Sequence, residues 1–203
     1  MPFPKGRWDE RVQHVWHWLK ARAGWEADHI LDRVEETSGA ARWQWAHRLR
    51  TVPLYTRHLR RILRLLDDPD AFLRWELAEI LAQQKPNRVL PLCLERARAG
   101  DPVEGLTACL RVLAALRDPA GLDAILAHRE HPNIHVRVAV ADALAAFIER
   151  PDAQAALLQL LEDEAPAVRR TVTWTLRRST APWARPVLLA CAQNSQDPWC
   201  TGA

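Results

Sequence analysis

The amino-acid sequence predicts an all-α protein, built mainly as an α-α superhelix (a right-handed solenoid of antiparallel helix pairs), and three observations support this. Apolar residues recur at i, i+3, i+4 and i+7 along most of the 203 residues, without the two-residue alternation of a half-buried strand. Proline recurs about every sixteen residues at positions that suit the first turn of a helix, where its missing N–H leaves no hydrogen bond unmade. A longer repeat of one turn and two helices recurs through the second half of the chain.

The composition excludes several classes of protein. A chain that is 48% hydrophobic and 26% charged buries a core and is not intrinsically disordered. No apolar run free of charges approaches the roughly 18 residues of a membrane span, so no bilayer crossing is expected. No two of the four cysteines are spaced as in a zinc-binding Cys-x-x-Cys motif. The first residues lack the apolar stretch of a secretory signal, which predicts a cytoplasmic protein.

Charge is unevenly divided along the chain. There are 13 basic and 7 acidic residues up to Leu66 (net +6), and 15 basic and 18 acidic residues after it (net −3). This asymmetry points to the first third of the chain as the part most attractive to an anionic partner.

Residues 1–52 are predicted to form a Trp-rich helical N-terminal cap, with helices near 8–22, 25–36 and 40–51. The first of these carries one apolar stripe, which suits packing against the end of a repeat array. The stripe consists of Trp8, Val12, Val15, Trp16 and Leu19.

Residues 53–203 are predicted to form about four full helix pairs and a truncated fifth. Four turns align without gaps, starting at Asp68, Asp101, His131 and Asp163 with steps of 33, 30 and 32 residues. The expected pairs lie near 54–84, 87–116, 119–148 and 151–178, and a fifth opens near 181. Pro91 and Pro186 fall inside first helices, so kinks are expected there.

The aligned segments carry Val-Arg after an Asp-rich turn and then an Ala- and Leu-rich helix, as in Val136-Arg137 through Leu144. In this they resemble the short bacterial HEAT repeats often labelled phycobilisome-lyase-like. The resemblance implies that second helices line the concave side of the solenoid, and that such proteins serve as scaffolds, adaptors, chromophore-lyase subunits or, in a divergent relative, DNA glycosylases. Thr107 stands where the pattern has Arg, so a ladder of Asp–Arg contacts between repeats should be interrupted there.

A candidate partner-binding groove follows from projecting the second helices onto a wheel with Leu73, Leu106, Val136 and Val168 facing inward. The opposite rows are mostly small and apolar with a tryptophan near each end, which suits a partner helix or an extended peptide. A rotation of about 40° would instead place part of these rows in the core between repeats. The groove residues are Trp75, Glu79, Ala108, Val112, Val138, Asp142, Arg170 and Trp174, with Ala82, Ala115, Ala145 and Arg177 in the next row.

A second candidate surface is a basic stripe in an arginine-rich segment. Residues 37–66 contain seven arginines and no acidic residue. Arg57, Arg60, Arg61 and Arg64 occupy one helix face, where planar guanidinium groups suit phosphate or carboxylate groups. A stripe of this kind either contacts nucleic acid or an acidic partner, or is an ordinary solvated face.

The remaining constellations indicate little chemistry. His128, His131 and His135 offer three imidazoles across a turn, but Pro132 interrupts the helix that would align them, so ordinary turn histidines are expected and no metal or cofactor is predicted. Cys93 and Cys109 are expected to face each other as buried, unreactive core residues.

The leading hypothesis is a non-enzymatic scaffold or adaptor that binds a protein partner through its concave groove. The alternative is a nucleic-acid-binding solenoid that uses the Arg57–Arg64 stripe, with affinity that falls steeply with salt. An enzymatic function rests on the family resemblance alone, because the nucleotide, zinc-protease and serine-hydrolase motifs are all missing. Self-association through the truncated last repeat is a further expectation.

Overall fold

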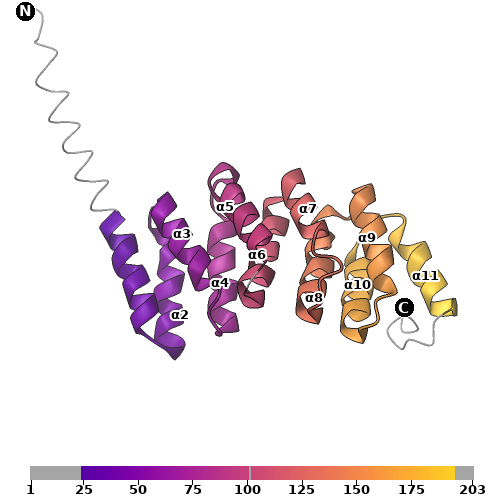
Figure 1. Cartoon of the computed structure of the whole chain (residues 1–203), viewed down its shortest axis with the longest axis horizontal. Helices are drawn as coiled ribbons and strands as arrows, with labels where there is room; N and C mark the ends of the chain where they lie inside the picture. The colour runs from indigo at the N-terminus through magenta and orange to yellow at the C-terminus, as the bar shows by residue number, and fades with distance from the viewer. Residues whose placement is uncertain (1–23, 101, 195–203) are drawn as a thin grey trace, which may run out of the picture. The chain divides into compact units, whose positions relative to one another are not determined.

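The computed structural model describes residues 24–100 and 102–194, and every regular element in these ranges is a helix (Figure 1). The all-α prediction is therefore confirmed. The expected helix near 8–22 lies outside the described residues, as does the end of the truncated fifth repeat. Self-association through that repeat accordingly stays a prediction.

The chain divides into two compact units, Met1–Ile62 and Leu63–Ala203. The division falls inside helix α3 (Thr56–Leu65), whereas the sequence suggested a boundary between residues 52 and 53. That domain boundary, with the capping role of the first segment, stays a prediction, and each unit is treated separately below.

The described part of the first unit contains a helix at residues 24–36, then α2 (Gly39–Arg48), the 3-10 turn η1 (Leu49–Thr51) and the start of α3. These are the elements expected near 25–36 and 40–51. The Nε of Arg42 donates to the carbonyl oxygen of Val34 at 2.8 Å and ties α2 to the preceding helix. The core of this unit consists of Ala27, Ile30, Leu31, Val34, Ala46, Leu49, Leu54, Leu59 and Ile62.

The second unit contains three of the four predicted helix pairs in full and the second helix of the pair expected near 54–84. Its elements are α4 (Ala71–Ala82), α5 (Pro86–Ala99), α6 (Val103–Leu116), α7 (Pro119–Leu126), α8 (Ile134–Ala143) with η2 (Leu144–Phe147), α9 (Pro151–Leu161), α10 (Pro166–Arg178) and α11 (Ala184–Asn194).

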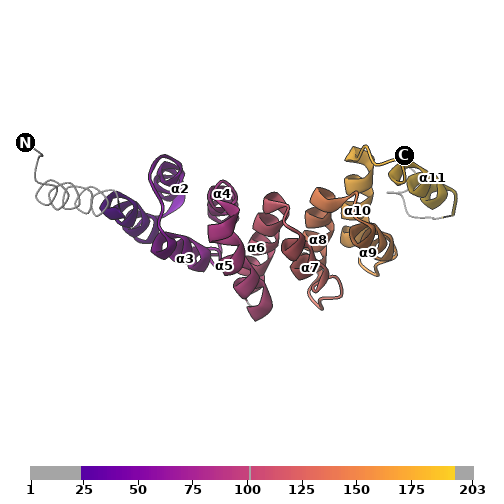
Figure 2. The same ribbon diagram turned by 90° about the horizontal axis from the view of Figure 1, so that it is seen from above.

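These helices form two layers. The second helices α4, α6, α8 and α10 pack against one another in chain order, and the first helices α5, α7 and α9 do the same. Figure 2 shows the two rows, with α4 to α10 on one side and α5 to α9 on the other. Each helix pair shares its apolar surface with its neighbours, which is the arrangement of an α-solenoid.

Proline and capping residues mark most helix starts. Pro86, Pro119, Pro151 and Pro166 are each the first residue of a helix. Elsewhere a side chain accepts the first free N–H groups: Asp70 caps α4, Asp118 caps α7 and Asn133 caps α8.

The structure gives no reason to expect a kink at one of the two prolines, Pro186. Pro91 lies inside α5, which continues through it to Ala99. Pro186, in contrast, lies in the first turn of α11, because this helix begins only at Ala184. The N–H groups of a first turn have no partner inside the helix, so Pro186 removes no hydrogen bond and the prediction of a kink there is corrected.

The predicted inward register is correct. Leu73, Leu106, Val136 and Val168 are each 0% exposed. The residues four positions later, Leu77, Leu110, Val140 and Val172, are likewise 0% exposed. The spacing of aligned turns in the sequence therefore gives the core-facing stripe of all four second helices.

The turns before the second helices share a side-chain pattern. Asp68, His131 and Asp163 each accept a hydrogen bond from the backbone N–H two residues later, at 2.9, 3.1 and 2.8 Å. Six residues after each of these, Arg74, Arg137 and Arg169 donate back to the carbonyl oxygen of the same turn residue, at 2.6, 3.0 and 2.8 Å. These bonds fold each turn onto the helix that follows it.

One of these arginines also joins two repeats. The guanidinium of Arg137 binds both carboxylate oxygens of Asp163 in the next repeat, at 2.8 and 3.0 Å. Burial opposes ionisation of Asp163, but hydrogen bonds from Arg137 and from the N–H of Ala165 outweigh it and lower the pKa of the carboxyl. At the aligned position, Thr107 donates to the carbonyl oxygen of Glu104 in its own helix, and a threonine has no guanidinium to bind a carboxylate of the next repeat, so the predicted interruption is found among the described residues.

Candidate functional site

The candidate groove lies over α4, α6, α8 and α10, the second helices of the solenoid. A pocket of about 180 Å³ opens between the first three, and a second pocket of about 540 Å³ shares five of its lining residues and extends to α10. The shared residues make the two pockets parts of one hollow. They are Arg74, Thr107, Arg111, Ala139 and Asp142.

Small side chains keep this hollow open. Ala71 and Ala78 of α4, Ala108 of α6 and Ala139 of α8 line the smaller pocket beside Trp75. Glu104 and His135 add polar groups to the rim of the larger pocket. The hollow therefore combines four alanine side chains with charged groups of both signs, the guanidinium groups of Arg74 and Arg111 and the carboxylates of Glu104 and Asp142.

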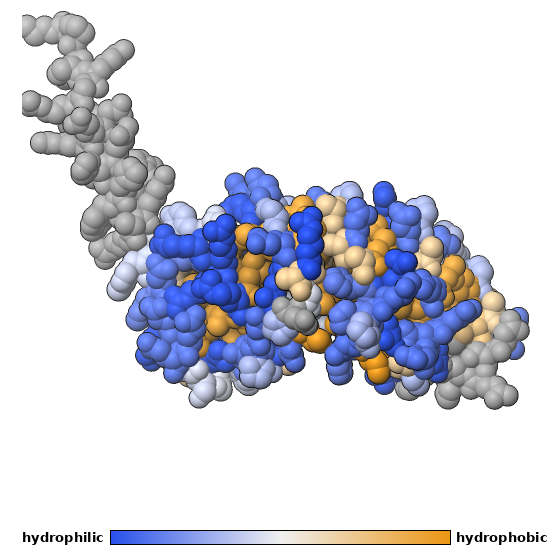
Figure 3. Space-filling view, viewed as in Figure 1, coloured by the Kyte–Doolittle hydropathy of each residue, from blue (hydrophilic) through white to orange (hydrophobic). Residues whose placement is uncertain are grey.

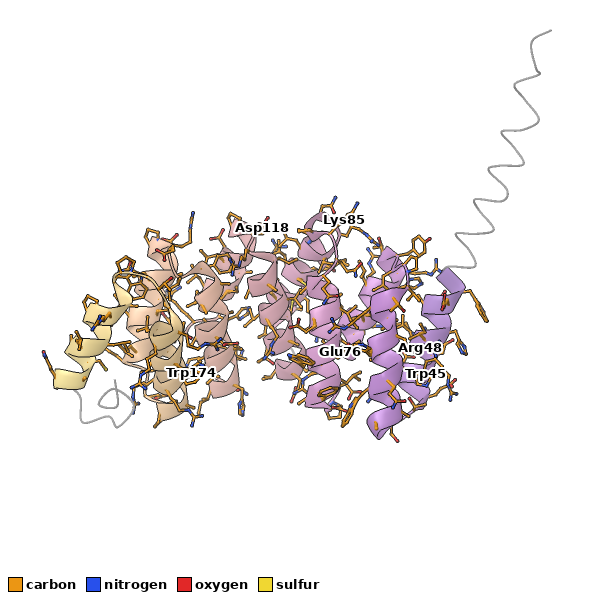
Figure 4. All side chains as sticks on the ribbon, turned by 180° about the vertical axis from the view of Figure 1, so that it is seen from behind. Trp45, Arg48, Glu76, Lys85, Asp118 and Trp174 are labelled. Carbon is orange, nitrogen blue, oxygen red and sulfur yellow. The ribbon has the colours of Figure 1, made fainter. Side chains whose placement is uncertain are left out.

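A third pocket, of about 430 Å³, lies on α10 and is lined by Arg170, Thr171, Thr173, Trp174 and Arg177. Trp174 is 59% exposed, and the guanidinium of Arg178 lies 5.8 Å from the centre of its ring. Figure 4 shows Trp174 projecting from the ribbon of α10. The Trp75 ring is 42% exposed at α4 and lies 5.7 Å from the ring of Phe72.

Six of the eight predicted groove residues line these pockets: Trp75, Ala108, Val138, Asp142, Arg170 and Trp174. Glu79 is half-buried on α4 and is not among the lining residues. Val112 is 0% exposed, which corrects its assignment to the groove floor. The reason is that α6 packs against α4 on one side and α8 on the other, which covers the Val112 position of α6.

Sequence analysis missed several groove residues. Arg111 is exposed on α6 and lines the hollow, whereas the sequence analysis had assigned this place to the next residue, Val112. Arg74, Thr107, Ala139 and His135 were also missed. Arg111 had a detectable signal, because a lone arginine in the apolar stretch from Leu106 to Leu116 marks the solvent side of that helix.

The basic stripe on α3 is partly neutralised by acidic residues of the helix at residues 24–36. Arg57 pairs with Asp28 at 2.9 Å, and Arg61 pairs with Asp32 and Glu35 at 2.6 and 2.7 Å. The hydrogen bonds that Arg61 donates to Glu35 and, to a smaller extent, to Asp32 raise the pKa of Arg61, whereas burial acts to lower it. Arg60 and Arg64 are exposed.

Next to this stripe, His58 is buried against the same acidic helix. Its Nδ1 accepts from the N–H of Tyr55 at 3.0 Å, and its Nε2 lies 3.1 Å from a carboxylate oxygen of Asp28 without full hydrogen-bond geometry. Burial lowers the pKa of His58, although Asp28 opposes the shift. The His58 ring and two of the four stripe arginines thus hold α3 to the helix of residues 24–36.

Aromatic and cationic side chains of the first unit contact each other. The rings of Trp25 and His29 stack at 5.7 Å, and His29 meets Trp45 edge-on at 5.9 Å. Arg48, labelled beside Trp45 in Figure 4, places its guanidinium 4.5 Å from the centre of that ring. The contact of His29 with Trp45 joins α2 to the preceding helix, and the neighbouring Trp25 and Arg48 side chains extend this aromatic and cationic cluster.

Two of the three histidines have separate backbone partners. The Nε2 of His128 lies 3.0 Å from the carbonyl oxygen of Ala97, and the Nδ1 of His131 accepts from the N–H of Asn133. Burial lowers the pKa of His128, against the effect of the Ala97 carbonyl. Within residues 24–100 and 102–194, no three His, Cys, Asp or Glu side chains are grouped so as to hold a metal ion.

Cys93 and Cys109 are free, buried thiols on the facing helices α5 and α6, as predicted. The Sγ of Cys109 donates to the carbonyl oxygen of Cys93 at 3.2 Å. The neighbouring Cys93 thiol, followed by burial, raises the pKa of the Cys109 thiol. Cys191, on α11, is disulfide-bonded, which the sequence analysis did not anticipate. The cytoplasmic location stays a prediction.

Among the helices in residues 24–100 and 102–194, none combines the length and apolar character required to cross a membrane. In Figure 3, hydrophobic residues form separate small areas between hydrophilic ones on the face shown.

Comparison with known proteins supports the fold. Residues 122–203 match a family model described as HEAT repeats, and no curated protein matches the chain. The match does not specify the phycobilisome-lyase-like subtype, which stays a prediction. The matched segment includes the complete pair α9 and α10, whose packing repeats that of α5 and α6. Residues 122–203 are therefore similar to HEAT repeats.

Proposed function

We propose that this chain is a non-enzymatic α-solenoid scaffold or adaptor that binds a protein partner in the groove over α4, α6, α8 and α10. The observation that carries the proposal is the continuous hollow between these helices, lined by the exposed Trp75, together with the neighbouring pocket on α10 that the exposed Trp174 lines. HEAT repeats generally mediate protein–protein interaction, which agrees with this assignment.

The chemistry of the groove suits a helix or an extended peptide. Alanine at four floor positions lets the backbone of a partner approach closely, while Trp75 and Trp174 supply large surfaces that binding would remove from water. Buried aromatic anchors of this kind each contribute about 2 kcal/mol or more to binding. The two tryptophans are therefore the side chains on which affinity should depend most.

The test compares three forms of the full chain as bait for native partners, with nuclease treatment and quantitative mass spectrometry. The double variant Trp75→Ala with Trp174→Ala should lose at least about tenfold of the captured partner, as expected for two anchors. Trp25→Ala is the matched control, because Trp25 is 66% exposed and lies outside the groove. If the double variant captured its partners as well as the wild type, the groove proposal would be abandoned.

The alternative, nucleic-acid binding through the α3 stripe, receives less support because Arg57 and Arg61 already bind carboxylates. Only Arg60 and Arg64 of that stripe present exposed guanidinium groups without a partner among the described residues. A low-salt gel shift that detects no DNA or RNA binding would remove this alternative.

A further inference from the structure

We infer that the partner presents a helical face with one acidic and one basic side chain, which bind Arg111 and Asp142 in the hollow of the groove. This inference rests on the proposed function and names the chemistry of the partner at the same site.

Arg111 on α6 and Asp142 on α8 are the exposed charged residues that line both pockets of the hollow. Within residues 24–100 and 102–194, neither side chain takes part in an ion pair, a hydrogen bond or a ring contact. The two side chains share a pocket but do not pair with each other. One positive and one negative charge are therefore available to a partner.

The other charged residues of the hollow are placed differently. Arg74 is half-buried, and its Nη1 donates to the carbonyl oxygen of Asp68 at 2.6 Å. Glu104 is exposed but lines only the larger pocket. In the region common to both pockets, Arg111 and Asp142 therefore decide which charges a partner meets.

The two charged residues stand on neighbouring helices beside small side chains. Helices α6 and α8 pack against each other (Figure 2), and the axes of packed helices lie about 8–10 Å apart. On each helix an alanine precedes the charged residue by one turn and also lines the hollow: Ala108 before Arg111, and Ala139 before Asp142. The backbone of a partner can therefore come close to both charges at once.

A partner that covers this surface removes both charges from water. A wholly apolar segment would leave them buried without counter-charges, which disfavours binding. A segment with charges of one sign would pair with one group and be repelled by the other, and the phosphates of a nucleic acid would meet this repulsion at Asp142. A segment with one carboxylate and one cation pairs with both groups and is the best electrostatic match.

The spacing of the helices sets the spacing in the partner. On a partner helix laid across α6 and α8, residues seven positions apart lie on one face, about 10 Å apart along the axis. Seven positions further, beyond the acidic residue, the same face reaches α4, where the exposed Trp75 accepts an apolar side chain. The expected pattern is a leucine, an acidic residue and a basic residue at successive intervals of seven.

The experiment uses three fluorescein-labelled, alanine-based helical peptides with leucine at the first of these positions. At the two charged positions they carry glutamate and lysine (the mixed peptide), two glutamates (the glutamate peptide) or two lysines (the lysine peptide). Binding to the full-length chain is measured by fluorescence anisotropy. The groove variants are Arg111→Glu, which makes both positions of the hollow acidic, and Asp142→Lys, which makes both basic.

Arg98→Glu and Asp123→Lys are the matched controls. They change the net charge by the same amounts at exposed positions on α5 and α7, outside the groove. A peptide preference that followed net charge alone would change in these variants as well.

The wild type and both controls should bind the mixed peptide at least about fivefold more tightly than the other two. Arg111→Glu should instead prefer the lysine peptide, and Asp142→Lys the glutamate peptide. A preference for the mixed peptide that persisted in both groove variants would overturn the inference, as would no binding of this peptide to the wild type up to about 1 mM. Tighter binding of a single-stranded oligonucleotide, abolished in Arg111→Glu, would also overturn it.

Circular dichroism checks that the groove variants are folded. If one were unfolded, Arg111→Gln or Asp142→Asn would take its place. The preference for the mixed peptide over the lysine peptide should then be lost in Arg111→Gln, and its preference over the glutamate peptide in Asp142→Asn.

Capture of native partners separates this inference from the proposed function. Loss of the partner in the tryptophan double variant but full retention in both Arg111→Glu and Asp142→Lys leaves the groove standing and refutes the charge pairing. Retention in all three variants refutes both proposals.

Discussion

Among single residues, the Arg137–Asp163 pair has the clearest energetic role. Both side chains are 9% exposed, and the two hydrogen bonds between them join successive repeats. Glu164 also contacts Arg137 at 3.2 Å, but its side chain is 87% exposed and solvent screens the interaction. The buried pair is therefore the contact whose loss should be measurable.

Replacing Arg137 with methionine should lower the free energy of unfolding by about 3 kcal/mol, because Asp163 is left buried without its cation. Methionine keeps most of the apolar stem, so the loss reports the missing guanidinium, which binds Asp163 and donates to the carbonyl oxygen of His131. Arg129→Met is the control, since the Arg129–Glu130 pair is exposed and should change stability by less than about 1 kcal/mol. Urea unfolding of the three proteins measures both values, and equal small losses in the two variants would contradict the prediction.

The same pair predicts a pH dependence. The pKa of Asp163 is lowered in the folded state, so its contribution to stability is present above the ordinary pKa of aspartate and is lost as pH falls through the lower, folded value. In Arg137→Met, the pKa of Asp163 should rise above its wild-type folded value, because the effects of Arg137 are gone and only the N–H of Ala165 and the charge of Arg169 still oppose burial. The stability difference between wild type and variant should therefore shrink as pH is lowered from 7 towards about 3. Unfolding measurements across this range check it, and a difference that stays constant with pH would refute it.

At the scale of the helices, the repeats share a turn in which one residue has two tasks. Asp163 accepts the N–H of Ala165 and also binds Arg137 of the preceding repeat, whereas His131 performs only the first task. The residue that would face His131 from the preceding repeat is Thr107 rather than arginine. The junction between α6 and α8 therefore lacks the ion pair that joins α8 to α10.

Installing that pair should strengthen the junction. Thr107→Arg combined with His131→Asp should show a favourable coupling of about 1 kcal/mol in a double-mutant cycle, because each single change supplies only one of the two charges. Aspartate keeps the turn hydrogen bond that His131 now accepts, as it does at Asp68 and Asp163. Urea unfolding of the two single variants and the double variant measures the coupling, and purely additive effects would argue against a shared junction geometry.

At the scale of the whole molecule, the unit Leu63–Ala203 is a repeat array in which a helix is held by its neighbours. Helix α6 packs against α4, α5, α7 and α8, whereas the main contacts of α11 are with α10. The cost of local opening in such an array grows with the number of packed neighbours.

Hydrogen exchange followed by mass spectrometry should therefore find the slowest amide exchange in α6 and α8 and the fastest, among α4 to α11, in α11. The expected gradient reflects local opening from the end of the array rather than global unfolding. Uniform protection from α4 to α11 would instead indicate a single cooperative unit and contradict this expectation.

Local signals in the sequence determined most of the fold. Helix starts are set by proline at the first helical position and by three capping residues, Asp70, Asp118 and Asn133. The sequence reveals them because proline and a capping side chain each act within a single helical turn. The repeat alignment placed Leu73, Leu106, Val136 and Val168 in the core, because the helical period alone decides which residues share a face.

Only the tertiary structure decided which residues the groove presents and which arginines are already paired. Val112 is buried because neighbouring helices cover its side of α6. Successive residues of a helix point in directions about 100° apart, so the adjacent Arg111 lies on a different side and lines the hollow. Arg61 binds Asp32 and Glu35, which are 29 and 26 residues away in the chain. Contacts over such separations depend on how helices pack, and the spacing of residues along one helix carries no information about the charges on the next.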